Sequence, residues 1–194
     1  SDDTSIFEVF ERLNTGGMLL NAQEVRNAVV GGDLNALTKE LNNLPKWRIL
    51  NNKSEPDNRY RDIEFILRLI ALENSYENYR KPMGSFLTNF LSINKTLTHQ
   101  EKLDITNKFT RTIELICDVL GENTFRLKKT VNTALADAIY VGIARNINHL
   151  PSNPREKYNQ LLLAPDFIDS IEQHTTDNEK VLNRIEMAIQ AFVR

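Results

Sequence analysis

The sequence predicts an all-α protein, a multi-helix bundle of roughly nine or ten helices. Serine, threonine or asparagine is followed three residues later by glutamate at several places, which is the pattern of a helix N-terminal capping box. Between these caps, apolar residues recur every three or four positions. No segment sustains the alternation of apolar and polar residues that is typical of a half-buried strand.

Composition limits the class of protein. The chain has 194 residues, of which 41% are hydrophobic and 26% are charged, enough apolar material for a core. The net charge of −2 argues against a surface that is basic throughout, although a local basic patch is compatible with it. Cys117 is the single cysteine, which excludes an internal disulfide. No apolar run approaches the roughly 18 residues of a membrane span. We therefore expect a cytoplasmic protein with no membrane partner.

The first part of the chain is punctuated by caps and glycines. Residues 5–8 (SIFE) form a capping box, and the short helix that follows is expected to end before Gly16. Residues 21–24 (NAQE) form a second box, and their helix is expected to stop at residues 31–32, which are both glycine.

Asp33 is expected to cap the third helix, which the Leu-Pro pair at residues 44–45 ends. Residues 51–58 are polar and contain a proline, so they are predicted to form a loop. Residues 59–72 follow, and they are apolar on nearly all sides from Ile63 onward. This pattern predicts a central, buried helix.

The second part of the chain contains only helical patterns. Further helices are expected at Pro82, at the capping box of residues 98–101 with closure at Gly121, over residues 131–147, after Asn153, at Pro165 and after the box at residues 176–179. We interpret residues 1–194 as a single helical domain, and its ends indicate a piece of a longer protein.

The chemistry-bearing residues are sparse. His99, His149 and His174 are dispersed and lie at expected helix ends, so structural roles are favoured for all three. No cluster with the spacing of metal ligands and no nucleotide-binding glycine motif is present. The residues alone therefore predict no catalytic group, no metal site and no cofactor within this chain.

The turn at Asn14, Thr15, Gly16 and Gly17 is the most informative feature, and it has two interpretations. It can be a helix–helix corner, with glycine taking a positive φ. Alternatively, the amides of Gly16 and Gly17, with the N-terminus of the helix after Asn21, form an anion-binding nest for a phosphate.

Polar residues that follow this turn are ambiguous as well. Glu24 closes a capping box, which is a sufficient structural role, while Arg26 and Asn27 would point towards a ligand or towards water. Arg68 lies in an apolar run and needs a partner, and Glu64, four residues earlier, is the expected one. Asp62 would reach the glycine turn or belong to an internal lattice of salt bridges.

A second basic group is Arg126, Lys128 and Lys129, which with residues 80–81 (Arg-Lys) would make a local phosphate-binding patch. A solvated charged face is the alternative.

Three segments together resemble a known family. Residues 10–17 (FERLNTGG) with residues 23–27 (QEVRN) resemble the F-x-x-I-N-T-G-G and Q-E-I-R-N signature of the GmrSD N-terminal domain family. Residues 59–68 (RYRDIEFILR) resemble its R-M-x-D-x-E-x-I-L-R-F block, and residues 124–126 (TFR) resemble its A-F-R element. The matches come in the family's order and span residues 5–145, and residues 146–194 form a helical extension outside them.

The resemblance implies a part in bacterial restriction or anti-phage defence. The family's N-terminal part resembles the ParB and sulfiredoxin fold and carries an Asp-Gly-Gln-Gln-Arg motif for nucleotide hydrolysis, while an HNH-type domain cuts DNA. This sequence has neither element, so the resemblance implies only the helical half. The expected partners are the ParB-like domain, DNA and the HNH-type nuclease, and a nucleoside triphosphate with Mg²⁺ is expected only in the intact protein.

Carried over to this sequence, the family pattern places Asn14, Gly16 and Gly17 in a composite nucleotide pocket, with Glu24, Arg26 and Asp62 as support. The first hypothesis is therefore a helical accessory domain of a GmrSD-like protein that hydrolyses nucleotide and restricts DNA. The alternative is a helical protein–protein interaction scaffold that binds neither nucleotide nor DNA.

Overall fold

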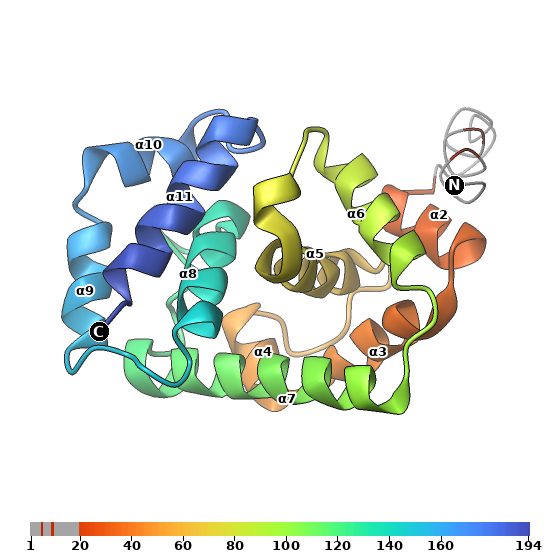
Figure 1. Ribbon diagram of the computed structural model, residues 1–194, viewed down its shortest axis with the longest axis horizontal. Coiled ribbons are helices and arrows are strands. Elements are labelled where there is room, and N and C mark those ends of the chain that lie inside the picture. The colour runs from red at the N-terminus through yellow and green to blue at the C-terminus, as the bar shows by residue number, and fades with distance from the viewer. Residues whose placement is uncertain (1–4, 6–8, 10–19) are drawn as a thin grey trace.

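The computed structural model describes residues 5, 9 and 20–194 (Figure 1). Within these residues the protein is all-α, with ten α-helices and no strand, as the sequence predicts. The helices are α2 (Ala22–Val29), α3 (Gly32–Leu41), α4 (Pro45–Leu50), α5 (Arg61–Ser75), α6 (Met83–Ile93), α7 (His99–Leu115), α8 (Thr133–Arg145), α9 (Pro154–Leu161), α10 (Pro165–Glu172) and α11 (Asn178–Ala191). A 3₁₀ turn (Tyr76–Asn78) follows α5, and a π-helical turn (Ile116–Leu120) extends α7.

Helices α5 and α8 form the centre of the molecule. Every residue of α8 from Ala134 to Ala144 is buried, and α5 buries ten of its fifteen residues. Figure 1 shows α11 alongside α8, and α7 running along one edge beneath α3, α4 and α8. The prediction of a buried central helix after the 51–58 loop is confirmed by α5.

An aromatic cluster joins four helices and the segment before α8. The Trp47 ring on α4 lies 5.3 Å from Phe65 on α5 and 5.9 Å from Phe109 on α7. Phe65 also packs on Phe125, and Phe109 packs on Tyr140 of α8. The two pairs of Trp47 are edge-on and the other two are tilted, and aromatic pairs of this kind favour one relative placement of their helices, beyond the area that they bury.

Two predicted capping boxes are confirmed, at Asn21 with Glu24 and at Thr98 with Glu101. The box predicted at residues 5–8 includes residues outside the described part. Asp33 is not the N-cap of α3, because Gly31 takes that position at φ 59°. Asp33 instead accepts hydrogen bonds from the Leu97 amide and from Lys102, which ties α3 to the start of α7.

Other differences concern helix ends. Asp177, and not Thr176, is the N-cap of α11. Helix α4 is not among the predicted elements. Helix α3 ends at Leu41, and Pro45 supplies the first position of the six-residue α4, where its fixed φ fits. Gly121 closes the long helix as expected, at φ 89°. Among the described residues, no helix has both the length and the apolar character needed to span a membrane.

The contact between α8 and α11 predicts a sensitive glycine. A Cβ atom at Gly142 would lie 2.9 Å from the Ala188 backbone and 2.9 Å from the Phe192 ring. We expect Gly142→Ala to lower the free energy of unfolding by about 1–3 kcal/mol, measured by urea denaturation, because two packed backbones must separate. Gly84→Ala is the control, since nothing lies within 4 Å of its Cβ. Equal stability of the two variants would contradict this packing.

Candidate functional site

The candidate site lies where α2 meets the start of α5. Asn14, Thr15, Gly16 and Gly17 fall outside the described residues, so the interpretation of their turn stays a prediction. The continuous described segment begins at Leu20, a few residues after that turn in the sequence. The polar residues on α2 and at the start of α5 lie within the described part of the chain.

Glu24 links the two helices. Its carboxylate accepts a hydrogen bond from the Asn21 amide at 2.6 Å, which closes the capping box, and pairs with the Arg59 guanidinium at 2.9 Å. The side-chain amide of Asn21 donates to the Arg59 carbonyl at 2.7 Å. Hydrogen bonds from Arg59, followed by the one from Asn21, lower the pKa of Glu24 below its usual value of 4.5.

Arg26 makes the second link. Its side chain is 0% exposed, and its guanidinium pairs with Glu64 of α5, whose side chain is 39% exposed. The Arg26 Nε donates to Gln23 at 2.9 Å. A fully buried guanidinium requires such a carboxylate, because an unpaired buried charge is strongly destabilising. We call Asn21, Glu24, Arg26, Arg59 and Glu64 the α2–α5 cluster.

Asn27 lies beside this cluster, and its side-chain amide nitrogen makes no hydrogen bond to the described residues. Its Oδ1 accepts from Gln23 at 3.3 Å, while its Nδ2 is buried and has no hydrogen-bond partner among the described residues. Gln23 also donates to Asn35 at 3.3 Å. An unsatisfied amide donor in a native structure calls for a specific explanation.

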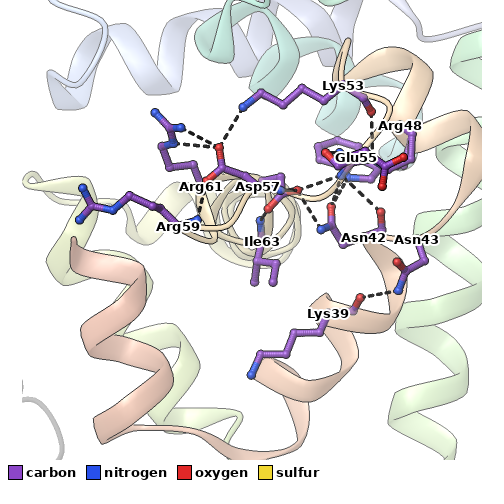
Figure 2. Close-up of polar contacts among 12 residues, drawn as sticks. Lys39, Asn42, Asn43, Arg48, Lys53, Glu55, Asp57, Arg59, Arg61 and Ile63 are labelled. Atoms are coloured by element: carbon purple, nitrogen blue, oxygen red, sulfur yellow. Dashed lines mark hydrogen bonds and ion pairs between the residues drawn. The ribbon is translucent and has the colours of Figure 1, made fainter. Parts of the chain in front are cut away.

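Asp62 belongs to a different network, and its partners Asn42, Arg48 and Asp57 are labelled in Figure 2. Its side chain is buried and accepts from Asn42 at 2.9 Å, from Arg48 at 2.9 Å and from the Asp57 amide at 2.8 Å. Burial works against its charge, but these donors outweigh it and lower the pKa of Asp62 below 3.8. Its described contacts favour the internal-lattice interpretation, in which Asp62 fixes the 51–60 loop.

The expected pairing of Arg68 with Glu64 is wrong. Arg68 makes a two-pronged contact with Asp137 of α8, at 2.8 and 2.6 Å. Asp137 is 0% exposed and also accepts from Arg184 of α11 at 2.7 Å. The largely buried guanidinium of Arg68 and the fully buried one of Arg184 thus share one carboxylate, and the Arg184 Nε has no partner among the described residues. Bidentate geometry to a buried acid outweighs a local pair with Glu64, which Arg26 occupies.

Arg126, Lys128 and Lys129 are not seen to join residues 80–81. Arg126 donates to the Ile49 carbonyl at 3.0 Å, at the end of α4, and Lys128 and Lys129 are exposed. Lys81, by contrast, pairs with Asp177 at 3.0 Å before α11. The described contacts place the two basic groups in different surroundings.

The described residues hold no group of three or more His, Cys, Asp or Glu side chains that would bind a metal ion. Cys117 is half-buried, and burial raises the pKa of its thiol to about 11, so it is a poor nucleophile at neutral pH.

Sequence reasoning missed the pairing partners within the candidate site. Arg59 and Glu64 both occur in the segment that resembles the family's second block, but nothing in their spacing links them to Glu24 and Arg26, which lie 35 and 38 positions earlier.

Comparison of the chain with protein-family models, curated proteins and solved structures gives no match.

The Glu24–Arg59 pair predicts a titration. Because the folded pKa of Glu24 lies below 4.5, the pair stabilises the fold above pH 4.5, and this contribution is lost as the pH falls through the folded pKa. We expect Arg59→Gln to raise the pKa of Glu24 towards 4.5, as followed by NMR of the side-chain carboxyl. Glu101, whose low pKa depends on Thr98, is the internal control. An unmoved Glu24 would contradict the pairing.

The shared carboxylate predicts an asymmetry in stability. Asp137→Asn leaves Arg68 and Arg184 buried without a counter-charge, so we expect it to cost about 3–5 kcal/mol of unfolding free energy. Arg68→Met should cost less, because Asp137 keeps Arg184. Urea denaturation measures both, and a cost for Asp137→Asn no larger than that of Arg68→Met would contradict the shared role.

Proposed function

We propose that this chain is the helical accessory domain of a GmrSD-like nucleotide-hydrolysing restriction or anti-phage protein. In this proposal the Asn14–Gly17 turn completes a nucleotide site, and the α2–α5 cluster holds the chain that leads out of that turn. One observation supports it: two segments that resemble the family, residues 23–27 and 59–68, are joined by two ion pairs.

The charge balance of the cluster defines its role. Arg26 and Arg59 carry two positive charges, and Glu24 and Glu64 carry two negative ones, so the paired groups have no net charge to attract a phosphate. The side-chain oxygen of Asn21 already caps the amides of Gln23 and Glu24. The cluster therefore positions the turn, and phosphate contacts come from the Gly16 and Gly17 amides.

The catalytic part is assigned elsewhere in this proposal. The ParB-like domain supplies the hydrolytic residues, Mg²⁺ accompanies the nucleoside triphosphate, and the HNH-type domain supplies DNA cleavage. A domain that only shapes and orders one wall of a composite pocket still affects the reaction, because small misplacements of a bound substrate reduce the rate strongly.

The test is calorimetric titration of GTP and of ATP with Mg²⁺ into this chain and into the intact protein. We expect binding only in the intact protein, and loss of binding in Gly17→Val, since a β-branched residue disfavours positive φ. Glu64→Gln should weaken binding by about tenfold, because it releases Arg26 from its buried pair.

Glu77→Gln is the matched control for Glu64→Gln. Glu77 is a half-exposed carboxylate that approaches Arg145 only to 3.8 Å, so it should leave nucleotide binding unchanged. If neither nucleotide binds the folded intact protein, the proposal fails and the interaction-scaffold alternative replaces it. If Glu64→Gln and Glu77→Gln behave alike, the α2–α5 cluster has no role in the site.

A further inference from the structure

Helix α2 is held to the rest of the molecule mainly by polar groups. Its buried residues are Gln23, Val25 and Arg26, so one valine is its buried apolar side chain. Among the described residues, the continuous apolar core has no member in α2 and begins at Val30, just after the helix. In α8, by contrast, all residues from 134 to 144 are buried. The hydrophobic effect therefore contributes much less to the docking of α2 than to the packing of the central helices.

Two ion pairs cross from α2 to the start of α5. Arg26 pairs with Glu64 of α5, and Glu24 pairs with Arg59, just before α5, at 2.9 Å. The Arg26 side chain is 0% exposed, so docking of α2 removes its charge from water, and a counter-charge is needed to offset that cost. The Glu64 side chain is 39% exposed and stays hydrated in either case. Docking of α2 is therefore coupled to the carboxylate of Glu64.

Figure 1 shows α2 at one end of the molecule, beside α3 and α6. The described hydrogen bonds from α2 to these two helices are long. Gln23 donates to Asn35 of α3 at 3.3 Å, and Arg26 donates to the Gly84 carbonyl of α6 at 3.5 Å. Helix α2 has eight residues, and isolated helices shorter than about 12–15 residues are marginal in water. When its ion pairs part, α2 therefore unwinds and does not persist as a free helix.

The chain is anchored again directly after α2. Val30 is 2% exposed and belongs to the apolar core. A Cβ atom at Gly32 would lie 2.5 Å from the Lys95 carbonyl oxygen, and the Asp33 amide donates to the same oxygen at 2.7 Å. These contacts do not involve α2, so they persist when α2 unwinds. The segment that opens therefore ends before Val30.

We propose that α2 is a polar latch: residues 21–29 open as one unit while α3 to α11 stay folded, and the Arg26–Glu64 pair controls how often this occurs. The opening is a property of this chain in the absence of nucleotide. Its consequence for function rests on the function proposed above. In that function an open α2 releases the Asn14–Gly17 turn from the nucleotide site, so the latch regulates that site.

Native-state hydrogen exchange of the whole 194-residue chain, followed by NMR without nucleotide, tests the opening. We expect the amides of residues 25–29 to have protection factors at least about tenfold below those of α8. Their exchange should depend little on low concentrations of urea, because opening α2 exposes little surface. The Asp33 amide should be protected like the rest of the fold. Equal protection and equal urea dependence in α2 and α8 overturn the proposal, because α2 then opens only when the whole chain unfolds.

Variants of the ion pair test the latch in the same exchange experiment. Glu64→Gln removes the carboxylate that pairs with Arg26, so exchange of the α2 amides should rise about tenfold while α8 is unchanged. Adding Arg26→Met to Glu64→Gln removes the buried charge as well, so much of the protection should return. Glu77→Gln removes the same charge from an exposed carboxylate 3.8 Å from Arg145 and should leave α2 unchanged.

Two results overturn the role of the ion pair. One is equal acceleration of α2 and α8 in Glu64→Gln, which indicates that the whole fold is weakened. The other is no recovery of protection in the double variant, which indicates that the buried charge of Arg26 does not drive the opening. These measurements use no nucleotide, so a failure of the nucleotide titrations and a failure of the latch are distinguishable.

Discussion

The buried carboxylate of Asp137 is the interaction on which the rest of the structure depends. It lies in α8 and meets guanidinium groups from α5 and α11, so three helices are joined through one fully buried acid. Desolvation is unfavourable for all three charges, and only their mutual contacts offset it. Burial lowers the pKa of Arg184, while the carboxylate of Asp137 overcomes the burial of Arg68 and raises its pKa. The register of α5 against α8 is thereby restricted.

Because the register of α5 against α8 is restricted, the polar residues at the start of α5 have fixed neighbours. Successive residues of a helix point in different directions, so one short segment serves several neighbours. Asp62 holds the loop after α4, Glu64 pairs with Arg26 of α2, and Arg61 pairs with Asp57 in that loop. Helix α2 and the loop after α4 therefore share one support. A shift of α5 would disturb both, and a change confined to either network would disturb one.

Local signals in the sequence predicted most of the fold. Capping boxes, prolines and apolar periodicity act within a few residues, so α2, α5, α7 and α8 are predictable from the sequence. Helix α4 is not predictable from such signals, because its six residues are too few for a periodic pattern and are held by tertiary contacts around Trp47. The role of Asp33 as a hydrogen-bond acceptor is not predictable either, because it depends on Leu97, far along the chain.

The candidate site was predictable only in its residue types. The sequence indicates Glu24, Arg26 and Arg68, but their partners are Arg59, Glu64 and Asp137, which no spacing rule supplies.

Hydrogen–deuterium exchange of the intact protein, with and without GTP and Mg²⁺, tests most directly the proposal that α2 and the start of α5 support a nucleotide site. Nucleotide should slow exchange in peptides covering residues 12–30 and 59–68. Bound nucleotide with unchanged exchange in both segments would contradict the account.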